Sequence, residues 1–173
     1  HQAFVNMVRQ WGDATDPESI TRCEIGGRRD MFALMEYLKA HEPALSKAFI
    51  IDSGAVIGVR DSRHFSCHTR LSLTDCINRV HQPDSIGLGG HIIDIHATDG
   101  SAEQRRDPLP YYEIPLRALL PVGVPNLILA GRSIDADYAM FASARVMGTC
   151  MVMGQGAGTA AAWAVVHGSD VEH

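Results

Sequence analysis

The stretch RVMGTCMVMGQGAGTAAAWAVV, residues 145–166, decides how the rest of the chain is interpreted. After Arg145 it contains no charged residue and no proline, so it is expected to form one long helix. Four glycines lie within it, although each glycine inside a helix costs about 1 kcal/mol relative to alanine. Gly154 and Gly158 are four residues apart, so they share a face with several alanines. Such a face allows close approach of a flat ligand, or tight packing on a helix or sheet.

The same stretch is long enough to span a bilayer, and its GxxxG spacing is common in membrane helices. It consists mostly of glycine and alanine, however, and it includes Thr149, Gln155 and Thr159. It also lacks the flanking lysines and aromatic residues of a membrane helix. A membrane span is therefore not expected.

A short apolar run, NLILAG at residues 126–131, is expected to form a buried parallel strand before this helix. The charged residues between positions 120 and 166 all fall in the connection between that strand and the helix: Arg132, Asp135, Asp137 and Arg145. Ligands of α/β folds bind beyond the carboxyl ends of strands. The free N–H groups and positive dipole at the start of the helix would also favour an anionic or carbonyl-bearing ligand.

The remaining elements follow from hydrophobic spacing and turn residues. Apolar residues at helical spacing before Pro43 predict a helix over residues 28–41. Alternating or β-branched runs predict strands at 49–51, 55–59 and 91–97, with an extended segment at 65–73. Polar, glycine-bearing or proline-bearing stretches predict loops at 82–90 and 98–110, and residues 111–125 read as extended chain followed by a helical turn and a loop.

The predicted strand at 91–97 carries the first candidates for catalysis. Asp94 and His96 are two residues apart and project to one face, so they suit an acid/base pair. A hydrogen-bonded structural histidine is the alternative. His91 projects to the other face, so three metal ligands from this strand are not expected, and no metal site is predicted. Arg60 and Arg63 would suit a clamp for a substrate carboxylate, with ordinary ion pairs as the alternative.

Composition excludes several classes of protein. The chain has 173 residues and a net charge of -5, so it lacks the basic field that attracts nucleic acid. Its four cysteines form no CxxC pair, which argues against a structural zinc or iron–sulfur site. So few cysteines in a chain of this length are typical of a reduced protein, and a cytoplasmic location is expected.

Two glycine-rich stretches invite comparison with a dinucleotide-binding fingerprint. GQGAGT, residues 154–159, has threonine at the last position and lies deep in the predicted helix. GLGGH, residues 87–91, has the wrong spacing. The fingerprint requires a GxGxxG turn between a strand and a helix, so neither stretch qualifies.

Four segments in order, within about residues 26–166, are more specific together than any one alone: GRRDMFALMEYLKAHEPALSKAFIIDSGAVIGVRDSRHF, PDSIGLGGHIIDIH, YYEIPLRALLPVGVPNLILAGRSIDA and ARVMGTCMVMGQGAGTAAA. This combination resembles the carboxyl-terminal part of a family of FAD-dependent oxidoreductases that is distantly related to the fumarate reductase group. The resemblance implies FAD as cofactor and a small organic molecule as substrate.

The resemblance also implies roles for individual residues. Gly131 and Arg132 would lie near the ribityl and pyrophosphate part of FAD. A second group at the helix start would approach the isoalloxazine ring: Arg145, Val146, Met147, Gly148, Thr149 and Cys150. Backbone N–H groups there would stabilise negative charge at the N1/C2 carbonyl edge of the reduced flavin. A third group would belong to the substrate site: Arg60, Arg63, Asp94 and His96.

The family's amino-terminal βαβ unit, with its GxGxxG turn and acidic ribose-binding residue, has no counterpart in this sequence. The chain is therefore expected to be the carboxyl-terminal portion of a longer enzyme, with its missing cofactor half as a partner. The expected divisions are an amino-terminal segment, a substrate-side portion, a strand and helix of the FAD-binding domain, and a tail that could be a tag remnant: residues 1–25, 26–118, 119–168 and 169–173.

The expected fold is mixed α/β. An antiparallel substrate-side sheet with a helix would precede the last strand and helix of a dinucleotide-binding, Rossmann-like domain. Surface meant for the missing half would favour a homo-oligomer. The expected function is hydride transfer between FAD and a small organic substrate. The alternatives are a non-catalytic domain that binds a ligand or partner, and a hydrolase or lyase that uses His96 and Asp94.

Overall fold

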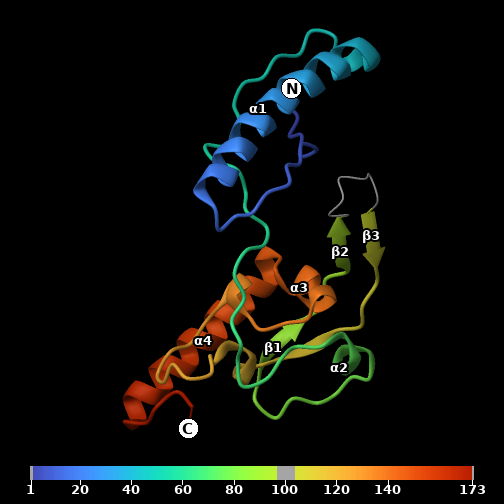
Figure 1. Cartoon of the computed structure of the whole chain (residues 1–173). Coiled ribbons are helices and arrows are strands. Elements are labelled where there is room, and N and C mark those ends of the chain that lie inside the picture. The colour runs from blue at the N-terminus through green and yellow to red at the C-terminus, as the bar shows by residue number, and fades with distance from the viewer. Residues whose placement is uncertain (1, 97–103, 173) are drawn as a thin grey trace. The chain divides into compact units, whose positions relative to one another are not determined.

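The computed structural model describes residues 2–96 and 104–172. The chain forms two compact units, residues 1–62 and 63–173 (Figure 1). Helices and antiparallel strands together confirm the predicted mixed α/β class. The divisions expected after residues 25, 118 and 168 stay predictions. Among the described helices, none is long and apolar enough to cross a bilayer.

The first unit is built on one helix, α1, Pro17–His41. The Asp16 side chain caps its start by accepting hydrogen bonds from two backbone N–H groups of the first turn, and proline occupies the first helical position. The helix stops before Pro43, which begins the 3₁₀ turn η1, Pro43–Leu45. The helix predicted over 28–41 therefore ends where expected but begins too late. The missed signal is the Asp-Pro pair at its true start.

The strands predicted at 49–51 and 55–59 are wrong, because both segments are irregular. Side chains of α1 occupy the backbone groups that a strand would use in a ladder. The Ile57 N–H donates to the Glu24 carboxylate at 2.6 Å, and the Arg28 guanidinium donates to the Ala55 carbonyl at 3.2 Å. Within the described part of this unit no strand is present to pair with them.

The second unit contains two antiparallel pairs of strands (Figure 1). Strand β1, Ser85–Gly89, pairs with β4, Tyr112–Pro115, and strand β2, Ile93–His96, pairs with β3, Gln104–Asp107. The predicted strand at 91–97 is confirmed as β2 over residues 93–96, whereas His91 and Ile92 lie just before it.

The two loops predicted beside it, 82–90 and 98–110, are wrong, because they contain β1 and β3; residues 98–103 lie outside the described part of the chain. The glycines that suggested a loop in β1 instead permit close packing. A Cβ atom at Gly87 would lie 2.3 Å from the Val152 side chain.

Helices complete the second unit. The long glycine-rich helix is confirmed as α4, Met147–His167, which ends at Gly168 in the left-handed conformation (φ 63°). The shorter helices are α2, Leu73–Ile77, and α3, Tyr138–Ala144, with 3₁₀ turns η2, Leu116–Leu119, and η3, Gly131–Ser133. The predicted extended segment and turn within 111–125 are therefore confirmed as β4 and η2. The predicted extended segment at 65–73 forms only two isolated bridges, through Cys67 and Leu71.

The parallel strand predicted at 126–131 is wrong. The segment is irregular, and Leu129 is its buried member while Leu127 is 40% exposed. Its Leu129 N–H donates to the Leu119 carbonyl at 2.8 Å, but no described strand runs beside it. An apolar run becomes a parallel strand only with a neighbouring strand to complete the ladder. The Rossmann-like arrangement therefore stays a proposal.

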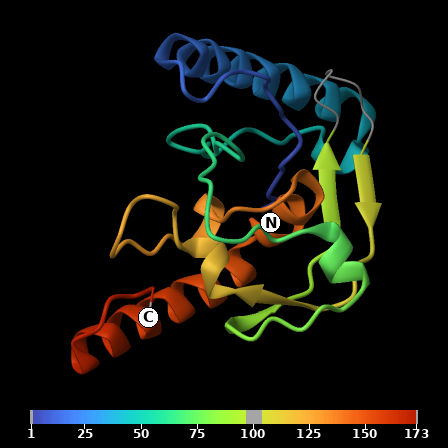
Figure 2. The same ribbon diagram turned by 60° about the horizontal axis from the view of Figure 1, so that its bottom comes forward.

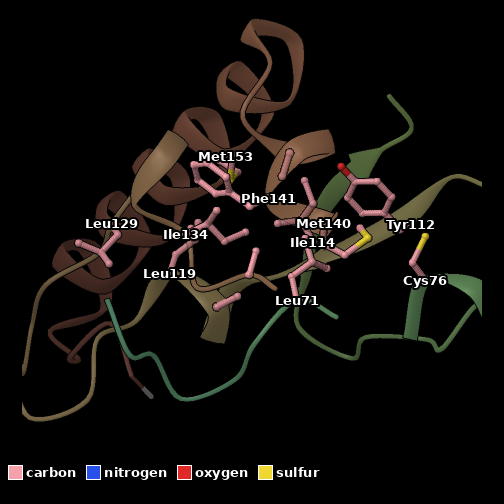
Figure 3. Packing of buried hydrophobic residues seen from close by; sticks show 13 residues of the cluster. Leu71, Cys76, Tyr112, Ile114, Leu119, Leu129, Ile134, Met140, Phe141 and Met153 are labelled. Carbon is pink, nitrogen blue, oxygen red and sulfur yellow. The ribbon is translucent and has the colours of Figure 1, made fainter. Parts of the chain in front are cut away.

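The hydrophobic core of this unit lies between β4, the turn η2, helix α3 and the inner face of α4 (Figures 2 and 3). Ile114, Leu119, Ile134, Met140 and Met153 are fully buried in it. Each such side chain contributes about 1.5–3 kcal/mol through burial. The core therefore holds the end of α3 and the start of α4 firmly in place.

Asp84 ties the loop before β1 to η2 and gives the unit a predictable acid sensitivity. Its carboxylate accepts hydrogen bonds from the Arg117 N–H at 2.9 Å and from the Arg117 guanidinium at 3.1 and 3.2 Å. Burial raises the pKa of Asp84, but the hydrogen bonds from Arg117 outweigh it, so the pKa lies below its ordinary value of 3.8. A depressed pKa stabilises the fold above that value, and the stabilisation disappears as the pH falls through the folded pKa.

We therefore expect the free energy of unfolding to fall less between about pH 7 and about pH 3 in Asp84→Asn than in the unchanged chain. Urea unfolding at both pH values measures this difference. Asp52→Asn, an exposed aspartate of the first unit, is the matched control. An equal loss of stability in Asp84→Asn and the unchanged chain would contradict the assignment.

Candidate functional site

Strand β2 brings Asp94 and His96 together, as their spacing predicted. The Nε2 atom of His96 lies 3.6 Å from Oδ2 of Asp94, and the two side chains are 16% and 21% exposed. The pair is thus largely withdrawn from water but not sealed from it. A carboxylate beside an imidazole can orient it and stabilise its protonated form, which is the arrangement that acid/base chemistry requires.

Arg145 joins this pair to the start of α4. Its backbone N–H closes α3 by donating to the Phe141 carbonyl. Its guanidinium donates to the Asp94 carbonyl at 2.8 Å and lies 3.5 Å from the Asp94 carboxylate. The Arg106 Nε atom lies 3.9 Å from the other carboxylate oxygen. The sequence suggested Arg145 for the cofactor and Asp94 for the substrate, and the structure places the two side chains in contact.

The first turn of α4 presents open backbone groups. Val146 precedes the helix in extended conformation, and no described side chain caps the helix there. The turn holds no acidic residue, and Met147 is 80% exposed. Gly148 is exposed, and no described atom lies within 4 Å of a Cβ built on it. The N–H groups of a helix start need an acceptor, and water or a ligand must supply it here.

Two further predicted residues adjoin this turn. Gly131 begins η3 in the left-handed region (φ 65°), and a Cβ there would lie 3.7 Å from the Cys150 Sγ atom. Arg132 follows it and is exposed. Burial raises the pKa of the Cys150 thiol, and the positive charge of Arg132 acts in the opposite direction. Gly131 and Cys150 therefore meet where η3 packs against the start of α4, with Arg132 beside them.

Tyr112 and Ser143 are buried polar residues that the sequence analysis did not identify. The Tyr112 hydroxyl lies 2.9 Å from the Ser143 Oγ atom, and Ser143 donates to the His91 carbonyl. The two side chains are 4% and 0% exposed. Tyr112 sits two residues before the fully buried Ile114 on β4, so strand alternation was the one signal that placed it inside.

The family model described as FAD dependent oxidoreductase matches residues 2–173. The chain belongs to the FAD dependent oxidoreductase family. No curated protein and no solved structure gives a significant match. Membership of this family means that FAD is the cofactor, while the distant relationship to the fumarate reductase group stays a prediction.

The start of α4 fits the flavin that this family binds. An anionic or carbonyl edge needs N–H donors, positive potential and room for a flat ring. The uncapped turn supplies the donors, and Gly148 leaves its outer side open. Thr149 is buried and faces inward, so its N–H rather than its side chain would be offered to a ligand.

The remaining residues that were predicted for the substrate site are Arg60 and Arg63. Arg60 belongs to the first unit and Arg63 begins the second, and both are exposed. Their role as a substrate clamp stays a prediction. Across residues 2–96 and 104–172, no group of three or more His, Cys, Asp or Glu side chains is arranged to hold a metal ion.

Proposed function

We propose that this chain supplies the carboxyl-terminal part of a flavin site, in an oxidoreductase that transfers a hydride between FAD and a small organic substrate. FAD, when bound, provides the two-electron redox chemistry. The chain would provide donors for the flavin ring through the first turn of α4, and an acid/base pair through Asp94 and His96. The observation that carries the proposal is the Arg145 bridge of 2.8 Å, which links these two parts.

The division of labour within the proposed site follows from the positions of its residues. The N–H groups of Met147, Gly148 and Thr149 would hold the ring edge that becomes negative on reduction. Gly131 and Arg132 would lie toward the ribityl and phosphate part. His96 would hold or release a proton at its imidazole, with Asp94 orienting the ring.

The sequence contains no GxGxxG turn between a strand and a helix. We propose that a separate segment with this fingerprint supplies the site for AMP and pyrophosphate. The alternative function is a non-catalytic domain that binds a ligand or partner without completing a flavin site. The lack of a GxGxxG turn in this sequence is the observation that favours this alternative. Each candidate predicts a different response to added FAD.

A flavin titration of the purified chain separates the two. If the helix start suffices for a site, FAD is expected to bind saturably, with quenched flavin fluorescence and a shifted visible absorbance band. Riboflavin and AMP added separately show which part of FAD the chain holds, and riboflavin is expected to bind better. Absence of binding both in this chain and in a protein that joins it to a GxGxxG-bearing segment would refute the flavin proposal and favour the alternative.

A further inference from the structure

We infer that Tyr112 is a positioning residue, whose phenol holds the strand bearing Asp94 and His96 at a fixed place relative to the first turn of α4. Its importance for catalysis rests on the proposed function. The physical claim concerns the chain alone, and it can be tested without flavin.

The hydrogen-bond chain has a definite direction. Ser143 has one hydroxyl hydrogen, and it donates that hydrogen to the His91 carbonyl. The Ser143 oxygen can then only accept from Tyr112, so the phenol donates across the 2.9 Å contact. Burial is the largest cause that raises the pKa of Tyr112 above its ordinary value. The phenol therefore keeps its proton and remains a donor.

The last acceptor in this series of hydrogen bonds, the His91 carbonyl, fixes the position of β2. The His91 carbonyl lies just before the strand, and the Asp94 carbonyl lies within it. Ser143 bonds the first and Arg145 bonds the second at 2.8 Å. Both donors lie at the C-terminal end of α3, which we call the corner. Two hydrogen bonds to backbone carbonyls therefore attach β2 to this corner. One residue, Val146, separates the corner from α4.

Tyr112 is itself held rigidly. It pairs with Gly89 in the β1–β4 ladder. A Cβ at Gly89 would lie 2.4 Å from the Tyr112 ring, so the ring lies directly over a position that only glycine can occupy. The ring also belongs to the hydrophobic core (Figure 3). These contacts hold the phenol oxygen in one place. Its hydrogen bond to Ser143, and the bond from Ser143 to the His91 carbonyl, hold β2 in place in turn.

The test is Tyr112→Phe, which removes one oxygen and keeps the ring. Tyr111→Phe is the matched control, because Tyr111 is the neighbouring residue and 60% exposed. We expect NMR signals of the Ile93–His96 amides, the His96 imidazole and the amides that begin α4 to move only in Tyr112→Phe. Amide hydrogen exchange in β2 is expected to accelerate by about tenfold, the opening expected from one lost hydrogen bond.

The inference fails if these signals do not move, or if exchange accelerates equally in β2 and in β1, because then the hydroxyl contributes only general stability. Ser143→Ala keeps the phenol and removes the bond to His91, so it must reproduce the shifts; combining both changes must add little further. If one variant does not fold, the other decides the matter. The chain without FAD gives all these signals, so a failed flavin titration and a failed inference remain distinguishable.

Discussion

Gly148→Val is expected to lower the affinity of the FAD-binding protein for FAD by at least about tenfold, or about 1.4 kcal/mol. The reason is geometric. The first turn of α4 is uncapped, and the side chain of residue 148 would project into the open space that the flavin ring needs under the proposed function. A branched side chain there would hold the ring away from the N–H groups. Equilibrium titration, followed by flavin fluorescence, measures the change.

The same substitution should hardly affect the fold, so a loss of affinity would report on the flavin site itself. No described atom lies within 4 Å of the new Cβ, and valine is a slightly better helix former than glycine. Gly158→Val is the matched control, because Gly158 lies in the same helix and is equally open. Equal FAD affinity in the unchanged protein and Gly148→Val would remove the flavin from the start of α4, whatever the family.

Asp135→Ala is expected to lower the free energy of unfolding of the second unit by about 2–3 kcal/mol. Asp135 is buried, and its carboxylate accepts from the Cys67 N–H at 2.9 Å and from the Arg70 guanidinium at 2.8 Å. The alanine would leave the Cys67 N–H without an acceptor. The Arg70 side chain is 64% exposed, so water would replace its lost partner and that contact contributes little. Urea unfolding measures the loss.

Asp135→Asn separates the hydrogen bond from the charge. An amide oxygen can still accept from the Cys67 N–H, so the asparagine variant is expected to lose only about 1 kcal/mol. If the alanine and asparagine variants are equally unstable, then the negative charge rather than the acceptor holds the segment. If both equal the unchanged chain, residues 67–70 are held by other contacts.

Local signals in the sequence were sufficient to predict the long helix and the pairing of Asp94 with His96. An uncharged run of about six helical turns has few alternative structures, and residues two apart on a strand share a face by geometry. The end of α1 was predictable for the same reason, because Pro43 cannot continue a helix.

Long-range contacts account for the errors. The run at 126–131 has the composition of a buried strand, but composition does not provide a neighbour to pair with. The glycines of β1 suggested a loop. The side chain that packs over Gly87 belongs to Val152, which lies far along the sequence, so no local signal showed that the glycine permits close packing. The same distance hid Tyr112 and Ser143, which are 31 residues apart. Nothing local marks either as half of a buried hydrogen bond.

The core of the second unit also determines when this protein can fold during its synthesis. Leu71, near the beginning of that unit, packs in one cluster with Met153, in the first half of α4. Asp135 is bonded to Cys67 across 68 residues of chain. Contacts of such long sequence separation form slowly and only after both partners exist. The nascent second unit must therefore stay open until α4 has left the ribosome, and a chain stopped after α3 would expose an unfinished core.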